Sequence, residues 1–296
     1  MKSKTKEALQ GYLYILPSFI LLLVFSVIPI FMCLYFSFTK YNILQAPEFL
    51  GLKNYFRLVQ DPFVLASLKN TLLYTFVVVP SQTLLSIGIA AVIAACFRRR
   101  FMRYGGLLRS AMFIPVISSA ILVGTLWSFL LSTDSGIINQ ILSFIRIPPI
   151  NWLGTTQTAL LSVCAVSIWK NVGYFMVIFY AGIMDIPGSL YEAAEVDGAT
   201  KIQQFLFITV PGLKPIIYLV VTLGTIWSFQ VFDIVYSMTG GGPGRSTVTL
   251  VLTIYNAAFK EYSMGYASSA AFLLFIIVIL LSIAQKKIFA EKEERA

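Results

Sequence analysis

The chain has 296 residues, of which 58% are hydrophobic and 12% are charged. Soluble domains are about 45–50% apolar and about 25% charged, so this composition excludes an ordinary soluble fold. The net charge is +9, but the Lys and Arg residues flank apolar runs and are not interleaved with a stacking aromatic surface. We therefore predict membrane lipid around the chain and no nucleic acid as a partner.

The residues on which most active sites depend are scarce. There is no histidine, and the three cysteines, Cys33, Cys96 and Cys164, all lie inside apolar runs. Histidine is the usual zinc ligand and the commonest general base. We therefore predict no metal site, no disulfide framework and no catalytic residue. A membrane-embedded enzyme would need a nucleophile with a base or a metal cluster, and neither pattern occurs in the sequence.

Apolar runs recur along the chain, and each is long enough to cross a bilayer core of about 30 Å. Because they lack strict alternation, they predict helices and not a β-barrel. The first run has about 28 uncharged residues, too many for a signal-peptide core of about 7–15, so we expect it to be retained. The fold class is thus predicted to be all-α, a polytopic bundle with six spans. The predicted helices are Gly11–Phe38, Thr71–Cys96, Ser110–Leu131, Gln157–Gly182, Leu213–Met238 and Met264–Ala284.

The distribution of basic residues predicts the topology. Six spans place both termini on one side, and that side receives about twice as many Lys and Arg residues as the other, which makes it cytoplasmic. We predict an N-terminal tail with the first helix and an external loop (1–65), a core of five helices (66–285) and a cytoplasmic tail (286–296). The segment 183–212 is then a cytoplasmic loop within the core.

Two short amphipathic helices are predicted in this loop. The first begins near Ser189, whose spacing to Glu192 is that of a capping box, and ends at Gly198. The second begins at Thr200, with Gln203 three residues further on. Such a hairpin can seat its small residues in the groove of a partner protein. An interfacial helix with a well-formed cap would explain the same pattern.

The run EAAEVDGA from Glu192 resembles the EAA loop of permease subunits of binding-protein-dependent ATP-binding-cassette (ABC) importers. That family has Glu-Ala-Ala, three residues, Gly, nine residues, Ile, one residue and Leu-Pro. Every spacing matches here, and Val210 replaces the Leu. In the family this loop is the coupling helix that docks on the cytoplasmic ATPase. The resemblance implies ATPase-coupling roles for Glu192, Ala193, Ala194, Asp197, Gly198, Ile208 and Pro211.

A second stretch, from Phe232 through TGGGPG at Thr239 to Thr247, resembles the carbohydrate branch of the family, close to maltose, glycerol-3-phosphate and multiple-sugar permeases. The resemblance implies a type I ABC importer permease fold in a bacterial-type cell membrane. It also implies a second permease subunit, an ATPase dimer that holds ATP and Mg²⁺, and an external substrate-binding protein. We expect no cofactor on this chain. The glycine run is not a Walker loop, because Thr239 and Arg245 stand where Gly and Lys are required.

Polar and aromatic residues in the fourth and fifth predicted spans are the candidate substrate contacts. Polar groups inside spans cost free energy and are functional candidates by default. Aromatic faces stack on sugar rings, and amides and hydroxyls bond to sugar hydroxyls. The candidates are Trp169, Asn171, Tyr174, Trp227, Ser228, Gln230 and Asp233.

Lys170 and Asp233 also invite the hypothesis of an ion pair. The rise of 1.5 Å per residue places them roughly 12 Å apart along the bundle, too far for a salt bridge unless a helix is broken or strongly tilted.

The sequence thus predicts a permease subunit that translocates a sugar by alternating access, energised by a separate ATPase. The alternative is an ion-coupled secondary transporter, which would need coupling carboxylates or an inverted repeat at mid-membrane.

Overall fold

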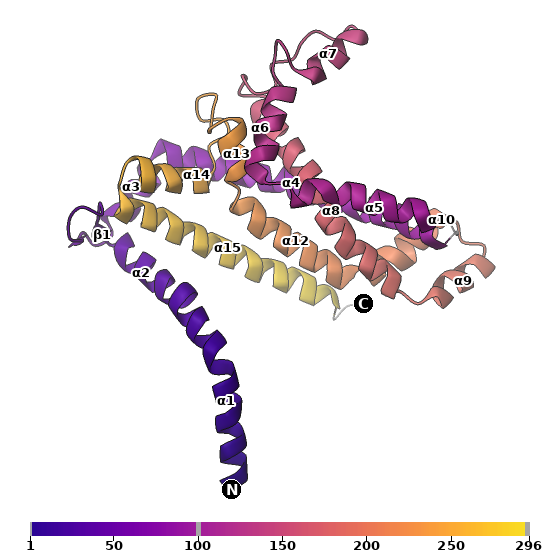
Figure 1. The fold of residues 1–296 in the computed structure, drawn as a ribbon, viewed down its shortest axis with the longest axis horizontal. Coiled ribbons are helices and arrows are strands. Elements are labelled where there is room, and N and C mark those ends of the chain that lie inside the picture. The colour runs from indigo at the N-terminus through magenta and orange to yellow at the C-terminus, as the bar shows by residue number, and fades with distance from the viewer. Residues whose placement is uncertain (1, 99–101, 294–296) are drawn as a thin grey trace. The chain divides into compact units, whose positions relative to one another are not determined.

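A computed structural model describes residues 2–98 and 102–293, and most of them are helical (Figure 1). Four helices are long and apolar enough to cross a membrane: Gly11–Ser37, Pro62–Ala95, Ala159–Asp185 and Met264–Phe289. Two bent pairs pass the same test, Gly106–Ile117 with Ala120–Leu130 and Lys201–Gly212 with Lys214–Phe229. The described part of the chain therefore has four candidate spans, or up to six if each bent pair is one span. The chain is an integral membrane protein.

The chain folds as two compact units, Met1–Asp61 with Ile254–Ile276 and Pro62–Thr253 with Ile277–Ala296. The first unit begins with α1 (Lys2–Leu22), the π-helical turn η1 (Leu23–Val27) and α2 (Ile28–Ser37), and continues with α3 (Lys53–Gln60). Its later part holds the π-helical turn η3 (Asn256–Lys260) and the start of α15 (Met264–Glu293), whose second half belongs to the other unit.

A small sheet that the all-α prediction did not anticipate follows α2. Strand β1 (Thr39–Lys40) pairs antiparallel with β2 (Glu48–Phe49), with Thr39 opposite Phe49. The buried Asn54 amide of α3 donates to the carbonyl oxygens of Ser37 and Thr39, both at 2.9 Å. These side-chain bonds fix the turn out of α2, because they satisfy carbonyls that the helix end leaves free.

The second unit carries the remaining helices. They are α4 (Pro62–Arg98), α5 (Met102–Ile117), α6 (Ala120–Leu130), α7 (Ile137–Phe144), α8 (Ala159–Asp185), α9 (Gly188–Val196), α10 (Lys201–Gln204), η2 (Phe205–Thr209), α11 (Val210–Gly212), α12 (Lys214–Phe229) and α13 (Asp233–Met238). Helix α14 (Leu250–Tyr255) begins in this unit.

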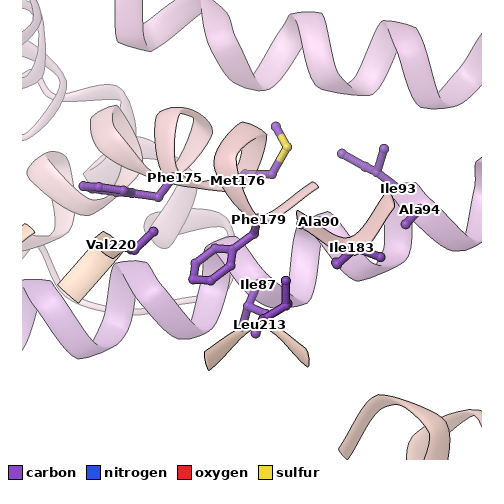
Figure 2. Packing of buried hydrophobic residues seen from close by; sticks show 10 residues of the cluster. All are labelled: Ile87, Ala90, Ile93, Ala94, Phe175, Met176, Phe179, Ile183, Leu213 and Val220. Atoms are coloured by element: carbon purple, nitrogen blue, oxygen red, sulfur yellow. The ribbon is translucent and has the colours of Figure 1, made fainter. Parts of the chain in front are cut away.

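The core of the second unit lies between α4, α8 and the start of α12 (Figure 2). Because lipid is as apolar as leucine, close packing and hydrogen bonds between helices hold such a bundle together. The Ser86 hydroxyl donates to the Val172 carbonyl at 2.9 Å, which joins α4 to α8. The buried side chains of the cluster are Ile87, Ala90, Ile93, Ala94, Phe175, Met176, Phe179, Ile183, Leu213 and Val220.

The third predicted span, Ser110–Leu131, is wrong as a continuous helix. Helices α5 and α6 meet at an angle of 98°. Pro115 lies in the last turn of α5, where it removes one backbone hydrogen bond, and Ser119 leaves helical geometry with ψ 132°. A proline followed by a Ser pair is a common cause of a sharp helix break.

The fifth predicted span, Leu213–Met238, is also interrupted. Helix α12 ends at Phe229, and α13 begins only at Asp233. Inside the membrane such a break requires another partner for the freed backbone groups. Thr249 provides one, since its hydroxyl donates to the Val231 carbonyl at 3.1 Å. An aspartate in the first turn of α13 also favours a helix start there.

Candidate functional site

The segment after α8 contains two short helices, as predicted, although the first one starts differently. Helix α9 begins at Gly188 with Pro187 as its N-cap residue, and no side chain caps it. The predicted Ser189–Glu192 capping box is therefore wrong, because Ser189 already lies inside the helix and Pro187 sets its start. The second predicted cap is confirmed: the Thr200 side chain accepts from the Gln203 backbone, and the Gln203 side chain accepts from Thr200.

A tight turn joins the two helices at Gly198, whose φ is +78°. The Gly198 N–H donates to the Glu195 carbonyl at 3.1 Å, and the Ala199 N–H donates to the Ala194 carbonyl at 2.8 Å. These two bonds form a Schellman motif, the usual way in which a glycine closes a helix end. The predicted helix end at Gly198 is confirmed.

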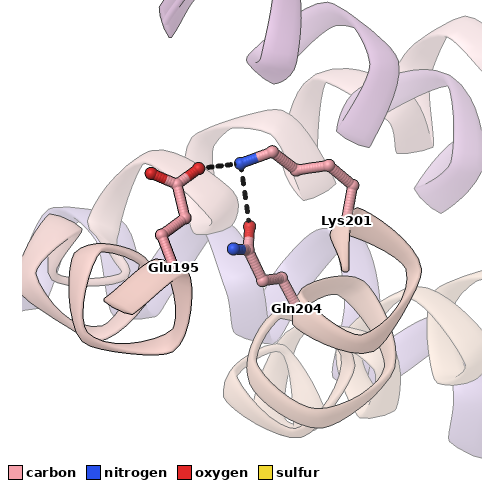
Figure 3. A network of polar contacts seen from close by, with 3 residues as sticks. All are labelled: Glu195, Lys201 and Gln204. Carbon is pink, nitrogen blue, oxygen red and sulfur yellow. Dashed lines mark hydrogen bonds and ion pairs between the residues drawn. The ribbon is translucent and has the colours of Figure 1, made fainter. Parts of the chain in front are cut away.

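Polar contacts hold the turn together from both sides. The Lys201 ammonium lies between the carboxylate of Glu195 on α9 and the amide oxygen of Gln204 on α10, 3.3 Å from the latter (Figure 3). The Tyr191 and Thr209 hydroxyls are 2.9 Å apart, which ties α9 to η2. Exposed ion pairs contribute little energy alone, so the Schellman turn and these contacts act together to define the hairpin.

The seven predicted coupling residues divide into two sets in the structure. Glu192, Ala193, Asp197 and Gly198 are exposed, and Ala194 is half-buried. Every residue of α9 is at least partly exposed, so the helix offers most of its surface outward. Ile208 is half-buried within η2, and Pro211 is exposed on α11. These two residues lie after α10, on the segment that leads into α12, whereas the first five lie on α9 and in the turn after it.

A cavity of about 180 Å³ lies among α4, α6, α8, α12 and α13. Its lining residues are Tyr74, Gln82, Ala120, Lys170, Asn171, Gly224, Trp227, Ser228, Gln230, Val231, Phe232, Asp233 and Ile234. A single water molecule needs only about 10–15 Å³, so the cavity has room for a larger polar ligand.

Five of the seven predicted substrate residues line this cavity: Asn171, Trp227, Ser228, Gln230 and Asp233. The other two lie beside it. Tyr174 packs against Trp227 with ring centroids 4.9 Å apart, and Trp169 packs edge-on against Trp127 at 5.3 Å. The interruption of α12 explains why residues 230–233 reach the cavity, since a continuous helix would turn some of them away.

Lys170 and Asp233 both line the cavity, but they form no salt bridge among the described ion pairs, which agrees with the predicted separation. The helix break at residues 230–232 precedes Asp233 at the start of α13. The Lys170 ammonium lies 3.4 Å from the Val116 carbonyl at the end of α5 and interacts electrostatically with Asp233. These two are the charged residues among the described lining, and their formal charges cancel.

Two lining residues, Tyr74 and Gln82 on α4, were missed by sequence reasoning. The sequence does carry a signal for Gln82, an amide inside an otherwise apolar span, and such residues are functional candidates. Small residues of the spans differ in their contacts: Ser86 bonds α4 to α8, and Gly224 lies against the Gln82 amide. A Cβ added to Gly88 would meet nothing within 4 Å, so Gly88 makes no close helix contact in the described structure.

The Gly-rich loop is a fixed structural element. The Thr239 and Thr247 hydroxyls are 2.7 Å apart, and the Asn70 amide of α4 donates to the carbonyls of Arg245 at 2.7 Å and Val248 at 3.0 Å. The Arg245 guanidinium lies 4.1 Å from the centre of the Phe63 ring. Arg245 occupies the position of the lysine in a Walker loop, and here its guanidinium makes a cation–π contact.

Comparisons with known proteins identify the family of the chain and its fold. Residues 71–292 match the family described as "Binding-protein-dependent transport system inner membrane component". The probable ABC transporter permease protein YurN of Bacillus subtilis is 37% identical over 96% of this chain and 97% of that protein. The trehalose/maltose transport system permease protein MalF of Thermococcus litoralis is 33% identical over 97% of this chain and 96% of its own.

A lactose transport system permease protein, LacF of Rhizobium radiobacter, is 34% identical over 97% of this chain and 95% of that protein. Among solved structures, a bacterial ABC transporter involved in the import of the acidic polysaccharide alginate superposes with a TM-score of 0.82 at 21% identity, covering 98% of both chains. The fold is therefore that of an ABC importer permease. The chain belongs to the binding-protein-dependent transport system inner membrane components, a family of membrane-embedded permease subunits and not of enzymes.

Proposed function

We propose that the chain is one of two permease subunits of an ABC importer that carries a sugar across the cell membrane by alternating access. Relatives named for trehalose/maltose and lactose transport align over nearly its whole length, which supports a sugar as the cargo. The residues lining the cavity suit that cargo, because indole rings stack on sugars while amides and hydroxyls bond to their hydroxyls. An ion-coupled transporter is not favoured.

The proposal includes the topology and the partners. The chain crosses a bacterial-type inner membrane six times, with each bent pair as one span and both termini in the cytoplasm. Residues 66–285 form the permease core. A cytoplasmic ATPase dimer holds ATP and Mg²⁺, and an external binding protein delivers the sugar. One solved relative of the same fold was crystallised with a substrate-bound periplasmic protein, which is consistent with such a delivery partner.

The observation that carries the proposal is the exposed hairpin built around Gly198. Helix α9 has little contact of its own with the bundle, yet its start, end and turn are all fixed. A rigid, outward-facing helix is what a docking element needs, because a preformed shape lowers the entropy cost of binding. In this proposal Glu192, Ala193, Ala194, Asp197 and Gly198 contact the ATPase, while Ile208 and Pro211 position the hairpin.

Copurification with the ATPase subunit tests this assignment. In Glu192→Lys, we expect the ATPase retained by the tagged transporter to fall about tenfold, since an interface residue that carries binding energy typically costs 1–2 kcal/mol or more. The matched control is Asp134→Lys, which makes the same charge reversal at an exposed residue on the loop after α6. Equal ATPase retention by both variants would contradict docking through α9.

Transport tests the cargo. In proteoliposomes that contain the complete complex and its binding protein, we expect uptake of radiolabelled maltose, trehalose or lactose to require ATP and to persist when ion gradients are collapsed. Uptake that follows an ion gradient without ATP would return the assignment to the secondary-transporter alternative.

A further inference from the structure

Gln82 stands out among the polar side chains of the second unit. It lies in the middle of α4, one of the helices that form the apolar core, and only 1% of its surface is exposed. Its amide oxygen has no hydrogen-bond partner among the described residues. A buried polar group without a partner costs free energy, so its retention inside a span calls for a compensating role.

Gln82 lies at the cavity, where such a role can be carried out. The side chain lines the cavity together with Asn171 of α8 and Ser228 of α12. Gly224 leaves room for it, because a Cβ at residue 224 would lie 2.5 Å from the Gln82 Nε2 atom. The amide therefore lies at the cavity wall against a glycine of the facing helix, and its buried oxygen has no hydrogen-bond partner among the described residues.

The cavity's charge indicates what kind of donor fits. Lys170 and Asp233 compensate each other, so the described lining has no formal net charge. An anionic cargo would gain no net attraction from such a lining, whereas a neutral polyol would find acceptors, donors and the Trp227 indole. A sugar hydroxyl is a donor that matches an orphaned amide oxygen.

We propose that Gln82 is a specificity-determining residue of the translocation path, whose amide oxygen accepts a hydrogen bond from a hydroxyl of an uncharged sugar in the cavity. This inference rests on the proposed function and goes beyond it, because it adds a residue of α4 to a site expected on the helices flanking the hairpin. It also commits the cargo to a neutral sugar.

The experiment compares Gln82→Met with Gln285→Met in proteoliposomes that contain the complete complex. Gln285 is the matched control: it is a half-buried glutamine of a span, and its amide oxygen is also unpartnered among the described residues. Its amide nitrogen, however, donates to the Thr225 hydroxyl, and the residue lies outside the cavity lining. Both replacements keep the length of the side chain and remove the amide. Because the external protein captures the sugar, contacts in the path should govern the maximal rate of uptake.

The test uses a panel of three sugars, maltose, trehalose and lactose. For the one that wild type imports fastest, we expect Gln82→Met to lower the maximal rate about three- to tenfold, the effect of one lost hydrogen bond. The ratio of its rates for two imported sugars should also change. Gln285→Met should leave that ratio unchanged. Gly224→Ala, which displaces the Gln82 amide without removing it, should reproduce the Gln82→Met effect.

Suppose that Gln82→Met and Gly224→Ala assemble in normal amounts and keep the wild-type ratio of rates for the two sugars. That result would overturn the role of Gln82 and leave the importer assignment intact. Faster import of glucuronic acid than of every neutral panel sugar by wild type would overturn the neutral-cargo part. Absence of ATP-dependent uptake of any sugar by wild type would instead overturn the proposed function and this inference with it.

Discussion

Gly198 shows how much of the hairpin depends on a single backbone conformation. With φ at +78° it allows the chain to pass from α9 to α10 through only four residues, 197–200, while the carbonyls of Ala194 and Glu195 remain bonded. A residue with a Cβ adopts this conformation at a cost of about 1–2 kcal/mol. There is open space around Gly198, so strain of the backbone and not steric overlap would oppose a substitution.

Replacing Gly198 with Ala should therefore loosen the hairpin without disturbing the bundle. We expect the amides of residues 198–201 to exchange about 5- to 30-fold faster, the factor that corresponds to 1–2 kcal/mol, and ATPase copurification to fall in parallel. Hydrogen exchange followed by mass spectrometry measures this. Gly188→Ala is the control, because that glycine also has open space but lies at the helical start of α9. Equal exchange in the two variants would contradict the account.

Some of these residues could be predicted from the sequence and others could not. The difference is how far along the chain each residue lies from the groups it contacts. Gly198 and the Thr200–Gln203 cap act over a few residues, so local spacing reveals them. Ser189 failed as a cap because Pro187 begins the helix first. Gln82 was missed because only the fold shows that α4 faces the same cavity as Asn171 and Ser228.

At the scale of elements, glycine allows two helices of the second unit to approach closely. Helices α5 and α8 meet at Gly173, where an added Cβ would overlap the Met112 carbonyl group. A side chain can rotate away from such an overlap, but a backbone carbonyl cannot. The two helices would therefore have to separate.

The stability of the purified subunit in detergent should report this difference. We expect Gly173→Ala to lose about 1–3 kcal/mol, the usual cost of overpacking. Gly88→Ala should be neutral or slightly stabilising, because its Cβ would meet nothing within 4 Å and alanine favours a helix by up to about 1 kcal/mol over glycine. Thermal unfolding of both variants checks the order, and a less stable Gly88→Ala would contradict it.

The spans themselves were predictable from hydropathy, whereas their breaks were not. Four apolar runs are uninterrupted helices close to the expected positions. The break after Phe229 depends on Thr249, which lies 18 residues further along the chain and provides the Val231 carbonyl with a partner. A helical periodicity carries no information about such a distant donor. The bend at Ser119 does have a nearby signal in the sequence, because Pro115 lies four residues before it.

At the scale of the whole molecule, the proposed topology makes a direct prediction about accessibility. Asp134 lies on the loop after α6, and Val196, 88% exposed, lies at the end of α9. If the termini are cytoplasmic, these positions are on opposite sides of the membrane.

Single cysteines at these two positions, in a chain whose Cys33, Cys96 and Cys164 are replaced by serine, test this topology. We expect a membrane-impermeant maleimide to label Asp134→Cys in intact cells and to label Val196→Cys only after permeabilisation. The labelled fraction can be measured by a mass shift on a gel. The reverse pattern would place the hairpin outside and exclude it as the contact for a cytoplasmic ATPase.

The length of α4 has a mechanical consequence. Its 37 residues extend about 55 Å, whereas a helix tilted by 40° needs only about 39 Å to cross a core of 30 Å. The helix is therefore longer than a single bilayer crossing needs by more than a full turn. In the first turns of the helix, the Asn70 amide donates to the Val248 carbonyl, and the Thr71 hydroxyl accepts from the Leu250 N–H. The Phe63 ring lies under the Arg245 guanidinium. The same rod reaches Ile87 and Ile93 in the packed core. A displacement of that core would therefore move the Gly-rich loop with it, so the loop and the core of this unit cannot move independently.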